Sequence, residues 1–428
     1  MSRLVVRGGL VIDPSQGIEE ERTLVVEDGV VRSLPAGPPA PLPGDEVVEA
    51  RGAWLLPGFV DLHTHLREPG EEGKETIETG GRAAAAGGYT SLVAMPNTKP
   101  PIDRPELVEW VRRRAAERSP VRVFTAAAIT VGQEGERLAE LAALQAAGAV
   151  AVTDDGRPVM SAGLMRRALE YARPLGLPVM VHEEDLTLVA GGVANEGPTA
   201  TRLGLRGNPA LAEVVMVLRD LALCEATGAR LHLAHLSAAA SVRAVREAKA
   251  RGVPVTAEAT PHHFTLDDEA LSGYRTEAKM APPLRSREDV SALRSGLADG
   301  TIDAIATDHA PHGAGDKDCE FDLAANGVVG LETAFALGLR LVHEGVLSRR
   351  RLVELFSSGP ARAFGLTGGT LKPGVPADFT LVDPALDWTV DPSAFASKGR
   401  NSPFAGWKLR GRVTSTYVGG RRVFPFHG

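Results

Sequence analysis

From Gly58 onward the chain alternates short apolar runs with amphipathic segments, and this alternation limits its possible folds more than any other feature. Helical patterns separate the runs, and several of these patterns end at glycine, as at Gly87, Gly148 and Gly228. The runs predict eight buried strands, at residues 59–61, 91–95, 121–125, 150–153, 179–181, 231–234, 253–257 and 302–306. Strands that alternate with helices form parallel sheets, so eight such units predict an α/β fold, a TIM-like (β/α)8 barrel over residues 57–365.

The two ends of the chain follow a different, two-residue period. Residues 3–13 and 22–34 alternate and are rich in valine, with a hairpin turn at Asp28-Gly29. Residues 378–382 and 414–418 alternate in the same way, and Gly419-Gly420 predicts another turn. We expect residues 1–56 and 366–428 to pair with each other and to form one small β-sandwich domain beside the barrel.

Composition and charge restrict the class of protein. The chain has 428 residues and a net charge of -7, which argues against nucleic-acid binding. Its two cysteines, Cys224 and Cys319, form no disulfide framework and suit a reducing compartment. No apolar run approaches the roughly 18 residues of a membrane span, and the N-terminus lacks the apolar core of a signal peptide. We therefore expect a cytoplasmic protein that does not associate with membranes.

Metal-ligand side chains follow one predicted strand after another. In a barrel of this kind the carboxyl ends of the strands build the active site. His63 and His65 end the first strand, and the two-residue period places both rings on one face. The ends of later strands carry further histidines and acids: Asp154, Asp155, His182, His235 and Asp308.

Histidine and carboxylate ligands without cysteine suit zinc or a related divalent ion. They are more numerous than one tetrahedral catalytic site requires. Two metals about 3.5–4 Å apart, bridged by a carboxylate, explain the surplus. Either Asp154 or Asp155 could be the bridging acid.

These motifs resemble those of the amidohydrolase superfamily and, more narrowly, those of bacterial type I dihydroorotases. The similarity covers nearly the whole chain. Its most specific stretches are DLHTHLREPG at 61–70, MPNT at 95–98, TDDG at 153–156, PPLR at 282–285 and TDHAPH at 307–312. The resemblance implies reversible cyclisation of N-carbamoyl-L-aspartate to (S)-dihydroorotate, a step of de novo pyrimidine biosynthesis. It also implies a homo-oligomer, expected to be a dimer, and a possible association with aspartate transcarbamoylase.

The resemblance also implies which residues bind metal, move the proton and bind substrate. It implies two Zn²⁺ ions per subunit, one held by His63, His65 and Asp308, with Asp155 as the bridge. His182 and His235 would hold the second ion, and a zinc-bound hydroxide would attack while Asp308 acts as general acid and base. Arg67, Asn97 and His312 would bind the substrate carboxylate. The implied substrate pocket contains these and four further residues: His65, Ala281, Asn326 and Gly327.

Two positions depart from the family pattern, and other functions remain as alternatives. Ala281 stands where the family usually has asparagine, and Ala325-Asn326-Gly327 stands where it often has Pro-Phe-Gly. Hydantoinases and allantoinases usually bridge their metals with a carbamylated lysine, and this chain has no lysine between Lys99 and Lys249. That difference argues against both enzymes. A non-catalytic partner of aspartate transcarbamoylase is a further alternative, but it should have lost metal ligands.

The remaining histidines have less specific interpretations. His232 lies inside the sixth predicted strand, so it is expected in the core or behind a ligand. His262 and His263 follow the seventh strand and fit either a structural role or hydrogen bonding to a ligand. His309 is expected to be structural.

Overall fold

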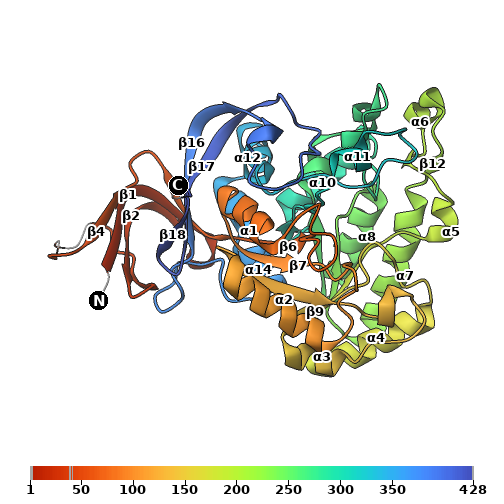
Figure 1. Cartoon of the computed structure of the whole chain (residues 1–428), viewed down its shortest axis with the longest axis horizontal. Coiled ribbons are helices and arrows are strands. Elements are labelled where there is room, and N and C mark those ends of the chain that lie inside the picture. The colour runs from red at the N-terminus through yellow and green to blue at the C-terminus, as the bar shows by residue number, and fades with distance from the viewer. Residues whose placement is uncertain (1–2, 38–39, 41, 427–428) are drawn as a thin grey trace.

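The computed structural model describes residues 3–37, 40 and 42–426, which form a barrel and a smaller sheet beside it (Figure 1). Eight parallel strands form the barrel sheet and are hydrogen-bonded in chain order. They are β6 (Phe59–Thr64), β7 (Tyr89–Ala94), β8 (Arg122–Ala127), β9 (Ala149–Val152), β10 (Val179–Val181), β13 (Leu231–Leu233), β14 (Val255–Ala259) and β15 (Ala304–Ile305). The predicted (β/α)8 barrel is therefore confirmed, with strand ends that differ by a few residues.

The barrel closes beyond the short strand β15. Thr64 at the end of β6 pairs in parallel with His309, and His65 N donates to His309 O at 2.9 Å. Buried Asp61 on β6 accepts hydrogen bonds from the backbone N–H and the hydroxyl of Thr307. Closure thus joins the stretch that carries His63 and His65 to the stretch that carries Asp308.

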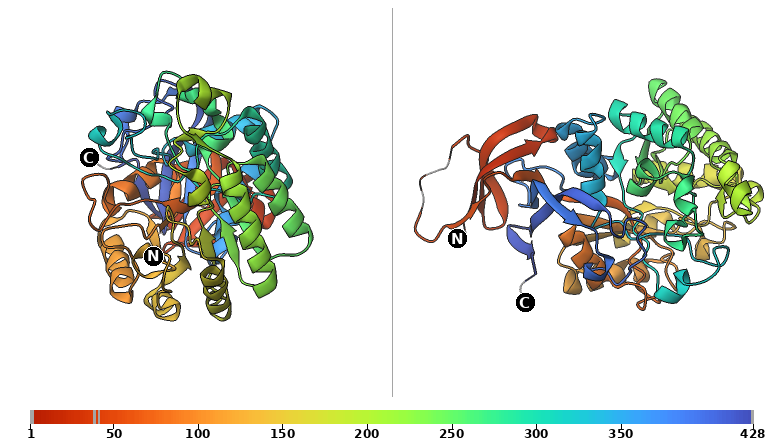
Figure 2. Two further views of the ribbon diagram at one scale, coloured as in Figure 1. Left: turned by 90° about the vertical axis from the view of Figure 1, so that its right-hand side faces the viewer. Right: turned by 90° about the horizontal axis from the view of Figure 1, so that it is seen from above.

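Helices cover the outside of the barrel sheet (Figure 2). Seven lie between successive barrel strands, as the alternating pattern predicts: α1 (Ile77–Ala86), α2 (Pro105–Arg118), α3 (Leu141–Ala147), α4 (Ala162–Leu175), α7 (Leu211–Thr227), α8 (Ala239–Ala250) and α10 (Arg287–Asp299). Another, α12 (Ala334–His343), follows β15. Side chains cap the N-termini of α1 and α10 in reciprocal pairs, Thr76 with Thr79 and Ser286 with Asp289.

The helices α13 (Arg349–Phe356) and α14 (Ser358–Phe364) follow one another directly. Ser357 between them has φ -129° and ψ -84°, outside the helical region. Pro360 has no N–H to donate to the preceding turn, so a continuous helix would lose a hydrogen bond there. In the first turn of α14 the missing N–H has no such cost.

Shorter elements in the loops surround the carboxyl ends of the barrel strands. Between β10 and α7 lie α5 (Leu186–Val189), β11 (Ala194–Asn195), α6 (Pro198–Leu203) and β12 (Gly207–Asn208). The helix α9 (Pro261–Thr265) follows β14, and α11 (Ala314–Lys317) follows β15. Within the described residues, no helix has the length and apolar character needed to cross a membrane.

The two chain ends form the smaller sheet, as predicted. Its order is β18-β17-β16-β5-β1-β2-β3, and β4 also pairs with β1. The strands are β1 (Arg3–Asp13), β2 (Ile18–Glu27), β3 (Val30–Ser33), β4 (Glu46–Glu49), β5 (Trp54–Pro57), β16 (Phe379–Thr389), β17 (Lys408–Val418) and β18 (Arg421–Phe424). The N- and C-terminal parts meet where β5 and β16 run antiparallel. β1 bends at Gly8-Gly9, because its first half pairs with β4 and its second half with β5.

This smaller sheet has a core of its own and is fixed to the barrel by polar contacts. Phe379 and Tyr417 stack in that core with ring centroids 4.4 Å apart. Arg122 on β8 makes a two-pronged ion pair with Asp378, with Nε 2.7 Å from Oδ2. The Thr416 hydroxyl donates to Ala85 O at the end of α1 at 2.7 Å.

Candidate active site

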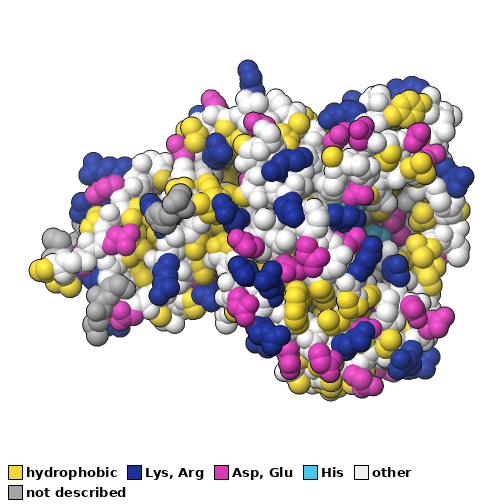
Figure 3. Space-filling model, viewed as in Figure 1, with side chains coloured by type: hydrophobic (Ala, Val, Ile, Leu, Met, Phe, Trp, Pro, Cys, Tyr) yellow, Lys and Arg dark blue, Asp and Glu magenta, His cyan; other side chains and the backbone are white. Residues whose placement is uncertain are grey.

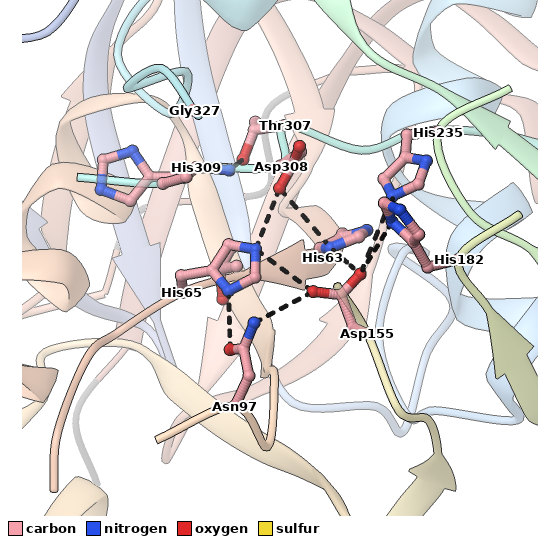
Figure 4. A network of polar contacts seen from close by, with 12 residues as sticks. His63, His65, Asn97, Asp155, His182, His235, Thr307, Asp308, His309 and Gly327 are labelled. Atoms are coloured by element: carbon pink, nitrogen blue, oxygen red, sulfur yellow. Dashed lines mark hydrogen bonds and ion pairs between the residues drawn. The ribbon is translucent and has the colours of Figure 1, made fainter. Parts of the chain in front are cut away.

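The strand ends bring six histidine and aspartate side chains together inside the barrel (Figure 4). All six are at least nine-tenths buried. Two groups of three have ligand atoms within 4.8 Å of one another: His63, His65 and Asp155, and Asp155, His182 and His235. Asp155 belongs to both groups. Asp308 lies beside the first group, with Oδ1 3.0 Å from His65 Nε2 and 3.5 Å from His63 Nε2.

The first group is oriented by hydrogen bonds behind the rings. His63 Nδ1 lies 2.8 Å from Glu258 Oε1 on β14, and since a carboxylate only accepts, Nδ1 carries the proton. His65 Nδ1 likewise lies 2.9 Å from Asn97 Oδ1, while Asn97 Nδ2 donates to Asp155 Oδ2 at 3.2 Å. Both rings therefore direct Nε2 toward the carboxylates of Asp155 and Asp308.

The second group is built in the same way. His182 Nε2 lies 2.9 Å from Glu184 Oε2, and Asn208 on β12 donates to the other oxygen of Glu184 at 2.7 Å. His182 Nδ1 then faces His235 Nε2 at 2.9 Å. These two nitrogens lie 3.9 Å and 3.7 Å from Asp155 Oδ1, so they converge on one point beside that carboxylate.

This donor set fits divalent cations. In a neutral His63 ring, the Nε2 lone pair would face Asp155 Oδ1 at 3.3 Å, which is repulsive without a positive charge between them. Among the described side chains, His63 Nε2 is one of the buried nitrogens that have no hydrogen-bond partner. Burial raises the pKa of Asp155, but the facing histidines outweigh this effect and hold that pKa well below its usual range. The site therefore requires positive charge beside ionised carboxylates.

The two neighbouring aspartates of the TDDG motif have different environments. Asp154 accepts hydrogen bonds from the backbone N–H groups of Ile129 and Thr130 and from the Thr130 hydroxyl. Burial raises the pKa of Asp154 to about 6. Its carboxylate thus points away from the histidines, and of the two aspartates Asp155 lies between them.

The residues expected to bind substrate line a cavity of about 680 Å³ beside the six side chains. In Figure 3 a histidine lies recessed in a hollow of the barrel part, next to acidic side chains. All seven expected residues face this cavity: His65, Arg67, Asn97, Ala281, His312, Asn326 and Gly327. The structure thus brings the predicted metal ligands and the predicted substrate residues to one place.

Arg67 and His312 are neighbours on one wall of the cavity. Arg67 Nη2 lies 3.4 Å from His312 Nε2, and Arg67 Nε donates to Pro311 O at 3.2 Å. Burial lowers the pKa of the Arg67 guanidinium from its ordinary value. Burial and the Arg67 charge lower the pKa of His312 to about 4, so that ring is neutral at physiological pH. A buried, incompletely paired guanidinium favours an anionic ligand.

The loop that carries Asn326 and Gly327 contacts His312 through its backbone. His312 Nε2 lies 2.8 Å from Asn326 O, so the backbone of Asn326 makes this contact. Gly327 has φ +127°, and a Cβ there would lie 2.6 Å from Ala310 Cβ and 3.2 Å from His312 Nε2. Only glycine fits this position without a shift of the cavity wall.

Backbone strain concentrates at the same place. Arg67, His235 and Asp308 have positive φ values of 60°, 29° and 46°. Such conformations are uncommon for residues other than glycine and are found most often where function requires them. Unfavourable φ values after three separate strands indicate that the positions of these side chains matter for function.

Three of the other histidines, His232, His263 and His309, make polar contacts outside the six-residue cluster. His232 Nε2 lies 3.0 Å from Glu258 Oε2, behind His63 as one interpretation expected. His309 Nε2 contacts Glu75 at 3.2 Å, and its Nδ1 accepts from Gly330 N. His263 bonds to the Thr260 hydroxyl and to Pro282 O. Neither His263 nor His309 faces the six-residue cluster through these contacts.

Glu258 and Glu184, which orient two of the clustered histidines, were not among the residues predicted from the sequence. The pKa of Glu258 is about 2, because hydrogen bonds from His232 and His63 outweigh the effect of burial. A signal was present, since Glu258 directly follows the apolar strand predicted at residues 253–257. An acid at the buried end of a strand requires a partner.

Comparisons with known proteins agree with this geometry. The family model described as Dihydro-orotase-like matches residues 52–241. The chain is 60% identical over 422 residues to a curated dihydroorotase of Anaeromyxobacter sp. (strain K), covering 98% of this chain and 97% of the relative. It is 53% identical over 421 residues to the dihydroorotase of Pelobacter propionicus, covering 98% of this chain and 99% of the relative.

Among solved structures, the fold resembles that of an L-hydantoinase (dihydropyrimidinase) from Arthrobacter aurescens. The TM-score is 0.90 at 27% sequence identity, covering 99% of this chain and 96% of the neighbour. The structural similarity indicates a shared superfamily, whereas the much higher sequence identities concern proteins named dihydroorotase. By that full-length similarity, the chain belongs to the dihydroorotase family.

Proposed function

We propose that this protein catalyses the reversible cyclisation of N-carbamoyl-L-aspartate to (S)-dihydroorotate, as a metal-dependent cyclic amide hydrolase of pyrimidine biosynthesis. The observation that carries the proposal is the pair of histidine groups that share Asp155 on the wall of a cavity that also contains Arg67. The relatives named dihydroorotase, at 52–60% identity over nearly the full chain, support the same reaction.

Two divalent ions per subunit, which we propose are Zn²⁺, suit the donor set. His63, His65 and Asp308 would hold one ion, His182 and His235 would hold the other, and Asp155 would contact both. Histidine and carboxylate donors without cysteine favour zinc over softer metals. When bound, such ions make water nucleophilic near neutral pH and polarise a carbonyl group.

Asp308 is proposed to move the proton. In the hydrolytic direction its carboxylate accepts a proton from the attacking water and passes it to the leaving ring nitrogen. Burial raises its pKa, but the facing His63 and His65 outweigh this and leave the pKa below its usual range. Asp308 is therefore ionised, as a group that accepts a proton must be. Cyclisation uses the same steps in reverse.

Arg67, Asn97 and His312 are proposed to position the substrate carboxylate. The Arg67 guanidinium offers N–H groups to two carboxylate oxygens at once. Asn97 already bonds to His65 and Asp155 and lines the cavity, so it would orient these ligands and have one further N–H for the substrate. The neutral His312 ring beside Arg67 adds no charge that would compete with the guanidinium.

Hydrolysis of a hydantoin-type ring is the alternative that the fold similarity favours. Asp155, rather than a lysine, occupies the bridging position, since the chain has no lysine between Lys99 and Lys249. This difference supports the dihydroorotase reaction. The non-catalytic alternative is disfavoured because all six expected ligand side chains are present and converge.

The test is a direct comparison of substrates. Purified protein should open the dihydroorotate ring in an absorbance assay, and should act on hydantoin and allantoin at least about 100-fold less efficiently. Elemental analysis of protein purified without chelators should find close to two divalent ions per chain. A preference for hydantoin would indicate that the protein is a hydantoinase. Activity of protein that contains no divalent metal would contradict the metal-dependent mechanism.

We further propose that residues 57–365 form the catalytic domain and that residues 1–56 and 366–428 together form the second domain. The protein is proposed to act in the cytoplasm as a homodimer, with aspartate transcarbamoylase as a possible partner. Light scattering on the purified protein, alone and mixed with that enzyme, tests the assembly: a mass of one chain would contradict the dimer.

A further inference from the structure

A segment of the C-terminal part returns to the carboxyl ends of the barrel strands. Residues 396–401 lie between β16 and β17 in the sequence, in the part of the chain that otherwise builds the smaller sheet. Glu332 Oε1 accepts from Ala396 N at 2.9 Å and from Ser397 N at 3.2 Å. The Ser397 hydroxyl donates to Glu75, which also contacts His309. The segment is therefore fixed to the barrel before it reaches Asn401.

Asn401 bonds to both ends of the loop 310–328. Its side-chain Nδ2 donates to Ala310 O at 2.9 Å and to Gly327 O at 3.0 Å. Its Oδ1 accepts from His312 N at 3.1 Å. Its backbone carbonyl accepts from Val329 N at 3.0 Å. Asn401 is only 5% exposed, so water does not readily replace these bonds.

The contacted groups leave little choice of side chain at position 401. Two loop carbonyls need donors and one loop N–H needs an acceptor, and a primary amide supplies all three. Aspartate has no donor for the carbonyls, and glutamine is longer by one methylene. The approach is close, because a Cβ on Gly399 would lie 2.6 Å from Pro311 Cβ and 2.7 Å from Val329 Cγ1. A buried backbone group that loses its partner destabilises the segment that carries it.

We propose that Asn401 is a positioning residue for substrate recognition, which holds the loop 310–328 so that His312 and Gly327 form the cavity wall beside Arg67. Pro311 O, which accepts from Arg67 Nε, lies in the same loop between two contacts of Asn401. The C-terminal segment thereby sets the geometry of the proposed carboxylate site without touching the substrate. The expected change in KM rests on the proposed function, whereas the expected change in the mobility of the loop 310–328 does not.

The structural consequence is tested by hydrogen–deuterium exchange of the whole protein. Peptides that cover residues 310–328 should exchange at least about tenfold faster in Asn401→Ala than in the wild type, since the three hydrogen bonds between the Asn401 side chain and the loop are lost. Thr416→Val is the matched control: it also removes a buried bond between the C-terminal part and the barrel, to Ala85 O, but at a distance from the loop. Its loop peptides should exchange as in the wild type.

The kinetic consequence is a split between KM and kcat. For Asn401→Ala we expect the KM for dihydroorotate to rise about tenfold or more, with kcat within about threefold and metal content unchanged. The discrimination between dihydroorotate and dihydrouracil, which lacks the carboxylate, should fall by a similar factor. Thr416→Val should keep wild-type values. Asn401→Asp keeps the acceptor for His312 N but turns a buried carboxylate toward the carbonyls of Ala310 and Gly327, so it should be at least as impaired as Asn401→Ala.

The outcomes separate this inference from the proposed function. Unchanged loop exchange in Asn401→Ala would overturn it, and so would faster exchange with an unchanged KM. An equal loss for both substrates would reduce Asn401 to a structural role. If Asn401→Ala does not fold, as judged by circular dichroism, Asn401→Ser replaces it in both measurements. A wild type that does not act on dihydroorotate would refute the proposed function alone, because the exchange comparison would still stand.

Discussion

Replacing Glu258 by glutamine tests whether groups behind the histidines tune the metal site. Glu258 accepts from His63 Nδ1 at 2.8 Å and from His232 Nε2 at 3.0 Å. Glutamine has nearly the same shape, and its single carbonyl oxygen can still accept from His63. Its amide can donate to His232 if that ring moves its proton to Nδ1, which lies 2.8 Å from the Thr256 hydroxyl. The fold should therefore survive, while the charge behind His63 is lost.

The size of the effect follows from the change in that one bond. A hydrogen bond to a charged group contributes about 1.5–3 kcal/mol, and a neutral one about 0.5–1.5 kcal/mol. The difference of about 1–1.5 kcal/mol corresponds to roughly a tenfold change in an equilibrium constant. Mutation of a residue that hydrogen-bonds to a metal ligand commonly lowers metal affinity or activity by about 10–100-fold. We expect Glu258→Gln to weaken zinc binding by about tenfold or somewhat more.

Competition with a chromophoric chelator measures this affinity, and Glu332→Gln provides the matched control. Glu332 is also a largely buried carboxylate, but it accepts from the backbone at Ala396 and Ser397. The control should bind zinc as the wild type does. Zinc affinity within threefold of wild type in Glu258→Gln would refute the reasoning, as would an equal loss in both variants.

Four further predictions concern single residues. Arg67→Met should lower kcat/KM for dihydroorotate by at least about 100-fold without loss of metal, and lysine should restore it only in part; a normal rate would contradict carboxylate binding by Arg67. Asp308→Asn should lower kcat by about 10²–10⁴-fold in a folded protein, measured under saturating substrate; near-normal turnover would assign the proton to another group. Gly327→Ala should destabilise the protein by about 1–3 kcal/mol in denaturant titrations and raise KM, because its φ of +127° and its contact with Ala310 Cβ exclude a side chain. Burial raises the pKa of Glu332 to about 7. Below the unfolded pKa of about 4.5 the carboxyl is protonated in both states. As pH rises from about 4.5 to 7 the unfolded state ionises while the buried carboxyl stays protonated, so stability falls, and the loss is complete above the folded pKa. Glu332→Gln should therefore raise Tm at pH 8 and leave it unchanged at pH 4, and equal shifts at both values would argue against this cause.

The sequence predicts those parts of the molecule that depend on local pattern. The barrel strands, most helices and the candidate ligands His63, His65, Asp155, His182 and His235 follow from periodicity and strand ends, because each lies at a fixed place in a repeated unit. The pairing of the chain ends follows from their shared two-residue period.

Contacts between distant segments did not follow from the sequence. Glu258 meets His63 across 195 positions, and Asn401 meets His312 across 89. Both depend on where loops and strand ends lie in space, which no local pattern encodes. The choice between Asp154 and Asp155 was open for the same reason. It depends on whether Ile129 and Thr130 are near enough to donate to Asp154.

The antiparallel pairing of β5 with β16 has a consequence for biosynthesis. β5 directly precedes β6, the strand that ends on His63, yet its partner emerges from the ribosome more than 300 residues later. A nascent chain released before β16 would contain all six proposed ligands and the whole barrel. It would leave the edge of β5 unpaired and would lack Asn401. A chain that terminates before β16 should therefore be prone to aggregation and have an incomplete substrate site. Full activity should require translation of β16 and Asn401.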